Sequence, residues 1–377
     1  MIFPRNPSKS ITLSVRSCVL SAGLTFTSLG CAQEYATPGE AAKDPDFHIQ
    51  GEYLGSVRFD AAEEPTRAGI QLAAQGEGTF KGFIYPGGLP GHGWVTKDGG
   101  QEPMTAERSN NVLQTEPIRG LTFRHEAGKF IAQDETGAER GRLERIIRTS
   151  PTEGKAPPQA AKVLFDGSNV EQWEDGARIV EGNLLDHGAR SADQYGDIYL
   201  HVEFRPGFMP SARGQKRANS GIYIQNRYEV QILDTFAMPL SNWMCASLYR
   251  FKAPTMNMGF PPFQWQTYDI FFRAPRFDDA GKKTENTRIT LFHNGVLVHD
   301  DLELPNGTGL GGRRPEVPKE HFLFQDHTGP VVFRNVWLLE DADTSSSHCV
   351  NGKPIKLGKT PLLWLSNPEL TSACENH

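Results

Sequence analysis

The second half of the chain consists of short apolar or alternating runs bounded by turn-forming residues, and no helix-length amphipathic pattern competes with them. The strands are predicted at Ile198–Phe204, Gly221–Gln225, Tyr228–Leu233, Tyr268–Arg273, Arg288–His293, Val296–His299, Phe322–Gln325 and Val331–Leu338. Many short strands with few helices are typical of a sandwich or jelly roll rather than of a doubly wound α/β fold. We therefore predict an all-β sandwich in this half.

The sequence of this region contains one strong signal for a β-hairpin turn. Asn294-Gly295 lies between two apolar runs, and both central positions of a type I′ turn need positive φ, which Asn and Gly tolerate best. The sequence predicts a hairpin that pairs Ile289–Asn294 with Gly295–Asp300.

The chain of 377 residues suits two domains, since domains usually run to roughly 100–200 residues. Short, turn-bounded runs at Gly51–Val57, Gly69–Ala74 and Thr79–Tyr85 indicate a small β-rich N-terminal domain over 33–148. The Pro and small polar residues of 149–161 favour an extended, unpacked linker. We expect the sandwich over 162–341 and a tail over 342–377.

Residues 1–32 have the pattern of an export signal. Basic residues up to Arg16 precede an apolar stretch, Cys18–Phe26, and small residues follow as far as Ala32. That stretch is too short for a bilayer, which needs about 20 apolar residues. Either cleavage after Ala32 or lipidation at Cys31 fits, so we expect a periplasmic or extracellular protein, attached to a membrane only if Cys31 is lipidated.

The cysteines outside this signal are Cys245, Cys349 and Cys374. Export permits disulfides, and a Cys349–Cys374 bridge would close a loop of about 25 residues in the tail. Cys245 is then expected to be a buried, inert thiol.

The net charge of −6 is distributed without long basic runs. Nucleic-acid binding needs a basic stripe that neutralises phosphates, so we predict no nucleic-acid partner. A neutral or weakly polar ligand fits better.

Alternation predicts one polar sheet face. In the Tyr228–Leu233 strand, Glu229 and Gln231 share the face opposite Val230. Phe322 and Phe324 likewise point into a core, while Gln325 and His327 point the other way. Antiparallel sheets often expose one face to water without any function, but aromatic residues nearby favour a sugar cleft. These aromatic residues, most of them expected in the core, are Trp173, Tyr195, Tyr223, Trp243, Tyr249, Trp265 and Tyr268.

The runs Ala218–Ile224 and Tyr228–Asp234 resemble the signature of the 3-keto-disaccharide hydrolase family. Further blocks resemble the family in order, namely Leu164–Gly167 with Trp173, Ser247–Tyr249 with Ala253-Pro254, Trp265–Asp269, Asn294-Gly295 and Gln325–Val336. The chain departs from the family in the polar stretch Phe277–Thr287, in the loop Gly307–Pro315 and in the large residues that follow Tyr249. These loops are expected to reshape the cleft.

The resemblance implies a concanavalin-A-like jelly roll that acts on glycosides oxidised to a ketone at C3. Such a ketone acidifies the C2 proton, so one base can initiate β-elimination of the C1 substituent, and water can then add. This route does not need the two carboxylates of ordinary glycosidases. The alternative is a non-catalytic carbohydrate-binding module, because fold does not fix function.

We assign Glu229 and His327 as the proton-transfer pair. The residues expected to contact or shape the sugar site are Asn219, Tyr223, Gln231, Tyr249, Tyr268 and Gln325. In the alternative interpretation, Glu229 pairs with Arg227 or Arg250 and His327 caps a turn. A divalent metal held by Glu229, His327, Asp234 and Asp326 is chemically possible, but no compact ligand spacing supports it, and no cofactor is predicted with certainty.

Overall fold

The computed structural model describes residues 33–60, 64–94, 100–109 and 112–340, together with two short tail strands, β24 (Cys349–Val350) and β25 (Lys353–Pro354). The predicted export signal and the side chains of the predicted Cys349–Cys374 disulfide lie outside this description. No helix in the described ranges is long and apolar enough to cross a bilayer.

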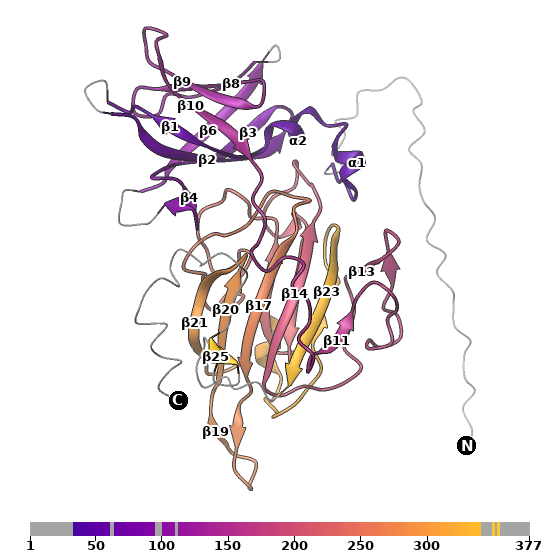
Figure 1. Ribbon diagram of the computed structural model, residues 1–377. Coiled ribbons are helices and arrows are strands. Elements are labelled where there is room, and N and C mark those ends of the chain that lie inside the picture. The colour runs from indigo at the N-terminus through magenta and orange to yellow at the C-terminus, as the bar shows by residue number, and fades with distance from the viewer. Residues whose placement is uncertain are drawn as a thin grey trace, which may run out of the picture. The chain divides into compact units, whose positions relative to one another are not determined.

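The N-terminal part is a closed antiparallel barrel (Figure 1), preceded by the short helices α1 (Pro38–Ala41) and α2 (Pro45–Ile49). Closure pairs every strand on both sides and so removes exposed edges. In spatial order the strands are β1 (Gly51–Val57), β10 (Glu139–Ile146), β9 (Lys129–Gln133), β8 (Thr122–Glu126), β7 (Val112–Thr115), β6 (Glu102–Ser109), β3 (Thr79–Pro86) and β2 (Thr66–Gly76). The short strands β4 (Leu89–Pro90) and β5 (Gly93–Trp94) pair separately.

The C-terminal part has one large and one small sheet. The large sheet runs β12 (Ile179–Val180), β13 (Leu184–Asp186), β23 (Val331–Glu340), β14 (Ile198–Pro206), β17 (Gln266–Arg273), β20 (Thr287–His293) and β21 (Val296–Leu304), with β11 (Lys162–Phe165) also paired to β23. The small sheet runs β16 (Tyr228–Leu233), β15 (Asn219–Ile224) and β22 (Leu323–Phe324). Smaller elements are the hairpin of β18 (Arg276–Phe277) and β19 (Lys283–Glu285) and the 3₁₀ turns η2 (Gly214–Lys216) and η3 (Gly309–Arg313).

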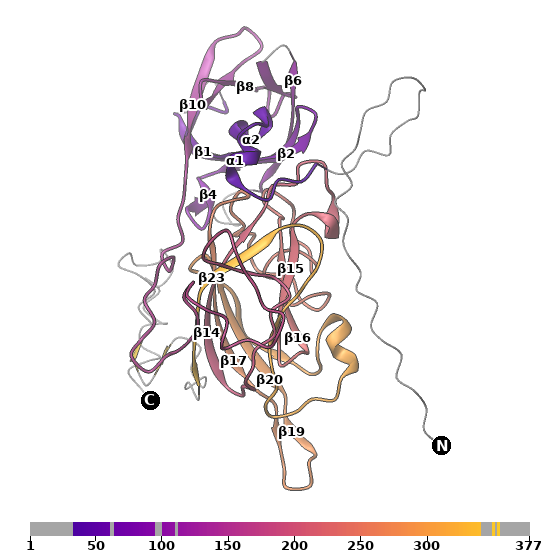
Figure 2. The same ribbon diagram turned by 90° about the vertical axis from the view of Figure 1, so that its right-hand side faces the viewer.

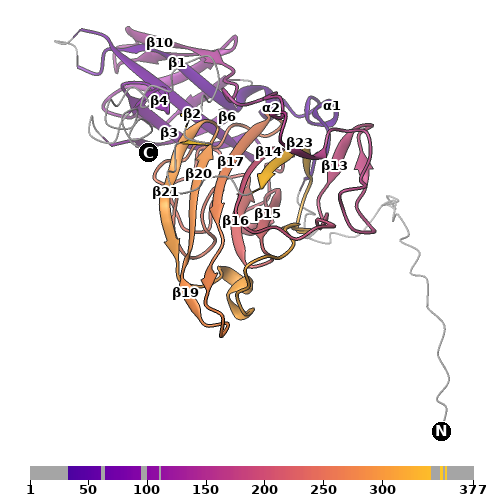
Figure 3. The same cartoon turned by 60° about the horizontal axis from the view of Figure 1, so that its bottom comes forward.

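The two sheets pack against each other, as Figures 2 and 3 show for β15 and β16 beside the large sheet. Leu200 and Val202 of β14 share a buried core with Ile222, Val230 and Ile232 of the small sheet. Because side chains alternate along a strand, the other faces of these strands are left for other contacts. The predicted all-β sandwich is confirmed.

The hairpin predicted at Asn294-Gly295 is also confirmed. β20 pairs with β21 across this turn, and φ is 49° at Asn294 and 75° at Gly295. Both central residues therefore adopt the positive φ that a type I′ turn requires.

The prediction that 149–161 is unpacked is wrong for its first part, 150–155, whereas 156–160 are exposed. Ser150 and Thr152 are buried, and their hydroxyl oxygens lie 2.6 and 2.8 Å from Oγ1 of Thr267 on β17. Lys155 donates a 2.8 Å hydrogen bond to the hydroxyl of Tyr199 on β14. The segment covers the outer face of the large sheet because polar residues of β14 and β17 on that face are its hydrogen-bond partners.

The loop before β15 contacts the barrel through two arginines. Arg213 donates a 2.6 Å hydrogen bond to the carbonyl of Gln75, and Arg217 donates one of 3.2 Å to the carbonyl of Ala74, both at the end of β2. Arg217 is fully buried and also donates to Asp234 at 2.7 Å. These contacts hold the backbone segment that leads into β15, the first strand of the small sheet along the chain.

Candidate active site

The outer face of the small sheet carries the predicted polar residues. Tyr223 stands opposite Glu229 in the β15–β16 register, and Gly221 stands opposite Gln231. The backbone N–H of Gln325 donates to the carbonyl of Gly221 at 2.8 Å, which aligns the third strand. Since the alternate residues of these strands fill the core, the predicted polar face is confirmed.

A cavity of about 460 Å³ opens on this face. Its lining brings together most of the predicted site residues with three that were not predicted. The lining residues are Gln215, Asn219, Tyr223, Glu229, Tyr249, Arg250, Gly309, Gln325 and His327. Glu229 on β16 and His327 in the loop after β22, assigned from the sequence as a pair, therefore share one cavity, although almost a hundred residues of chain separate them.

Glu229 is the buried acid of the cavity, with only 2% of its surface exposed. The hydroxyl of Tyr223 donates a 2.7 Å hydrogen bond to Oε2 of Glu229. Burial raises the pKa of Glu229 to about 7, although the bond from Tyr223 and the positive charge of Arg250 both lower it. No arginine of the described ranges lies within ion-pair distance of Glu229, so the alternative in which this carboxyl pairs with Arg227 or Arg250 is not observed.

Two glycines leave room for this carboxyl. A Cβ atom on Gly221 would lie 3.1 Å from Oε1 of Glu229, and one on Gly309 would lie 3.1 Å from Oε2 and 2.9 Å from Cδ1 of Tyr249. Gly309 also has a φ of +53°, in the left-handed region that side chains disfavour. A side chain at either position would therefore press on the Glu229 carboxyl.

His327 is exposed, and its ring orientation is set by its neighbour. The backbone N–H of Thr328 donates a 2.7 Å hydrogen bond to Nδ1 of His327. A nitrogen that accepts a hydrogen bond carries no proton, so the neutral imidazole carries its proton on Nε2. Nε2 is therefore the ring nitrogen left for other contacts, and the two-way proton transfer predicted from the sequence stays a prediction.

Side-chain amides surround the carboxyl. Oε1 of Gln215 accepts hydrogen bonds of 3.1 Å from both Asn219 and Gln231, so Gln231 contacts the cavity lining without being part of it. The amide oxygens of Asn219, Gln231 and Gln325 are buried and accept no hydrogen bond from the described part of the protein. An unpaired buried acceptor costs about 1–3 kcal/mol, so these three oxygens are unsatisfied polar atoms beside the cavity.

Tyr268 does not reach this site. Its ring is fully buried between the sheets, and its hydroxyl donates to the carbonyl of Gln231 at 2.6 Å and accepts from the backbone N–H of Ala246 at 2.7 Å. The sequence-based expectation that it contacts the sugar does not match this position, and Tyr268 instead holds the Gln231 backbone. Its neighbour Cys245 is buried, and burial raises the pKa of that thiol to about 11, which keeps the thiol protonated.

The four possible metal ligands are not all brought together. Asp234 forms a buried ion pair with Arg217 at 2.7 Å, and Asp326 lies 3.2 Å from Nδ1 of His187. Over the described ranges, no group of three or more His, Cys, Asp or Glu side chains is placed to hold a metal ion. Asp234 is unsuitable as a ligand because Arg217 already neutralises it.

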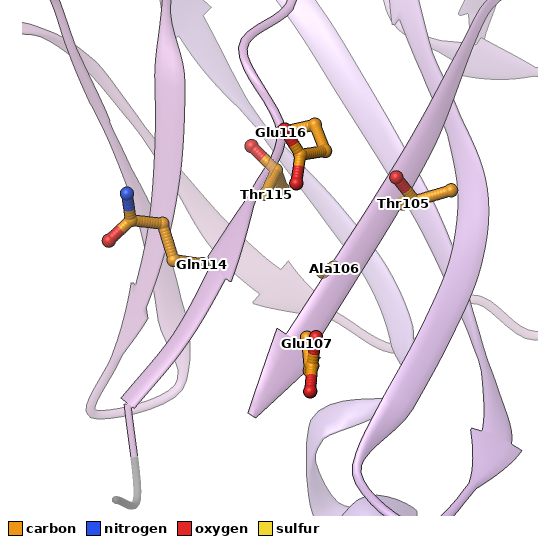
Figure 4. Close-up of a pocket in the computed structure, with 6 residues that line it drawn as sticks. All are labelled: Thr105, Ala106, Glu107, Gln114, Thr115 and Glu116. Atoms are coloured by element: carbon orange, nitrogen blue, oxygen red, sulfur yellow. The ribbon is translucent and has the colours of Figure 1, made fainter. Parts of the chain in front are cut away.

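A second hollow, of about 270 Å³, lies on the barrel between β6 and β7 (Figure 4). Its lining is Thr105, Ala106, Glu107, Gln114, Thr115 and Glu116. Glu107 and Glu116 are exposed, so water solvates both carboxylates. Glu229, in contrast, is buried.

Residues 160–339 match the model of the family described as the 3-keto-alpha-glucoside-1,2-lyase-like domain. The chain is also similar to crystal structures of candidate glycosyl hydrolases from Parabacteroides distasonis. One is 26% identical, with 48% of this chain and 84% of that chain covered and a TM-score of 0.44. Another is 14% identical, with 52% and 98% covered and a TM-score of 0.35. No curated protein matched the chain.

Proposed function

We propose that the protein is an exported enzyme that cleaves glycosides bearing a ketone at C3, because residues 160–339 match the model of the 3-keto-alpha-glucoside-1,2-lyase-like domain. The observation that supports this most is Glu229, a buried carboxyl in the cavity with a pKa raised to about 7. Near neutrality such a group is present in both protonation states, so it can accept a proton and give it back.

The reaction begins at the acidic C2–H bond beside the ketone. The Glu229 carboxylate takes this proton, the electron pair forms the enolate, and the C1–O bond then breaks as the leaving oxygen gains a proton. Water adds to C1 of the resulting enone, and a proton returns to C2. The net change is hydrolysis of the glycosidic bond, and it requires one base rather than a pair of carboxylates.

His327 serves as a neutral hydrogen-bond donor in this scheme. Because Thr328 occupies Nδ1, the Nε2–H group is the one available to the substrate. A donor aimed at the C3 oxygen stabilises the negative charge that develops there as the enolate forms. A neutral imidazole performs this role without giving up its proton.

The amide oxygens of Asn219 and Gln325 and the rings of Tyr223 and Tyr249 provide the binding surface. Amide oxygens accept hydrogen bonds from sugar hydroxyls, and aromatic rings pack against the C–H faces of a pyranose. This composition suits a neutral, hydroxylated ring.

The decisive experiment is product formation from a purified 3-keto-disaccharide, with wild type, E229Q and E303Q compared. Glu303 is an exposed glutamate on β21, so E303Q controls for loss of a negative charge. We expect turnover by wild type and E303Q and a loss of about 10²–10⁴-fold in E229Q. Binding of the unoxidised disaccharide without turnover of the ketone would indicate a carbohydrate-binding module, and neither binding nor turnover would refute a sugar-directed function.

Export is tested separately. Residues 1–32 have basic, apolar and small-residue segments in the order of a signal sequence. Mass spectrometry of the mature protein from the cell envelope should give a new N-terminus at Gln33 or a lipid-modified Cys31. Recovery of the full-length chain from the cytoplasm would contradict export.

A further inference from the structure

A hollow of about 570 Å³ adjoins the Glu229 cavity. Three residues, Gln215, Tyr249 and Arg250, line both spaces. The remaining lining of the second hollow is Gly214, Asn242 and Trp243. The two spaces therefore lie side by side and share part of their lining.

Trp243 is the aromatic residue that belongs to this second hollow alone. It is 36% exposed, which leaves part of a large flat ring uncovered. The side-chain amide of Gln215 donates a 3.2 Å hydrogen bond to the carbonyl of Trp243, and the same amide group accepts from Asn219 at 3.1 Å. Gln215 thus links the backbone of Trp243 to the amide cluster around Glu229.

Arg250 is held at the boundary between the two spaces in an unusual conformation. Its φ is 59°, in the left-handed region, and its backbone N–H donates to the carbonyl of Asn242 at 2.6 Å. Its guanidinium lies 5.3 Å from the ring centre of Tyr249, and no carboxylate of the described ranges lies within ion-pair distance of it. Unfavourable backbone conformations of this kind are concentrated at functional sites, and this guanidinium has donors free for a ligand.

We propose that the Trp243 hollow is the leaving-group subsite, and that it takes a second pyranose ring attached through C1 of the ring bound at Glu229. This assignment rests on the proposed function. A partly exposed indole beside an amide and a guanidinium fits a ring with apolar C–H faces and a hydroxylated rim.

The test compares two substrates on three proteins. The substrates are a 3-keto-disaccharide and the corresponding methyl 3-keto-glucoside, which has no second ring. The proteins are wild type, W243A and F251A. Phe251 is 45% exposed in the same loop and lines neither hollow, so F251A is the matched control for removal of an exposed aromatic ring.

For W243A we expect KM of the disaccharide to rise about tenfold, with a much smaller change in KM of the methyl glucoside, so that the ratio of the two KM values shifts. F251A should leave both constants at the wild-type values, and the melting temperatures of the two variants should agree. Equal changes of W243A toward both substrates, or a disaccharide KM equal to that of F251A, would overturn the subsite.

Failure of the proposed function has a different signature. If wild type turns over neither ketone, the chemistry is refuted, and calorimetric binding of the unoxidised disaccharide then decides the subsite. Weaker binding to W243A than to F251A would support a sugar-binding subsite without catalysis, and equal binding to both variants would overturn it.

Discussion

Tyr223 stands opposite Glu229 on the neighbouring strand, and its hydroxyl donates a 2.7 Å hydrogen bond to Oε2 of that carboxyl. This bond stabilises the ionised form of Glu229 and so opposes the effect of burial. The balance between the two effects keeps the carboxyl near a pKa of about 7, where a base is useful at neutral pH.

Replacement of Tyr223 by Phe should shift this balance toward the protonated acid. Loss of a hydrogen bond to a charged group costs about 1.5–3 kcal/mol, or about 1–2 pH units. The acidic limb of the kcat/KM profile should therefore move to higher pH in Y223F, while the maximal rate at alkaline pH changes less. An unshifted limb would mean that Glu229 is not the group that titrates.

The stability of E229Q should exceed that of wild type at alkaline pH. The folded-state pKa of Glu229 is raised to about 7 from 4.5, so the folded protein binds more protons than the unfolded chain between these values. Wild-type stability should then fall as pH rises through this window, by about 3 kcal/mol in total. Urea unfolding at pH 5 and pH 8 checks this, because the amide of E229Q removes this pH dependence and E303Q keeps it.

Substitutions of His327 should show whether its imidazole acts as a hydrogen-bond donor or as a proton-transfer group. Gln places an amide N–H near the position of Nε2, whereas Asn places its polar group near Nδ1. We expect kcat/KM of H327Q to exceed that of H327N and H327A by about tenfold, in line with the contribution of one donor to an oxyanion. Equal and severe losses in all three would favour proton transfer by His327.

Asp269 should contribute to the stability of the fold and should not affect substrate binding at the Glu229 cavity. Its carboxylate accepts from Tyr199 at 2.6 Å and from Thr152 at 2.8 Å and lies 2.8 Å from Nδ1 of His201. Although burial favours its neutral form, His201 and Lys155 lower the pKa of Asp269 to about 2.

Because removal of one partner leaves a buried charge uncompensated, D269N should lose about 3–5 kcal/mol of unfolding free energy. D279N, in the exposed β18–β19 turn, should lose almost none. Denaturant titration measures both, and KM of folded D269N should equal that of wild type.

Period-two alternation was sufficient to predict the face that carries Glu229 and Gln325, because one side of each small-sheet strand is core. The same argument explains why Tyr268, which was expected to contact the sugar, lies in the core. Tyr268 lies on the same face of β17 as Ile270 and Phe272, which are core residues. The period of two therefore places its ring in the core as well. Its hydroxyl made it resemble a ligand contact.

Other features had no sequence signal. Gln215 reaches the site from the 3₁₀ turn η2, and a turn of this length has no periodicity to interpret. Arg250 and Gly309 lie in loops that depart from the family pattern. Whether these residues face the cavity depends on the conformation of each loop, which the sequence does not reveal. The packing of 150–155 has no sequence signal either, because hydroxyl-rich, Pro-punctuated chain has the same composition whether it is solvated or hydrogen-bonded to a sheet.

That packing changes where the sandwich begins along the chain. A fragment starting at Lys162, the first residue of β11, would lack the partners of Thr267 and Asp269 and would open the outer side of β14 and β17 to water. A fragment starting at Ser150 would retain them. The segment between barrel and sandwich is therefore part of the sandwich, and truncation studies should treat Ser150 as its N-terminal limit.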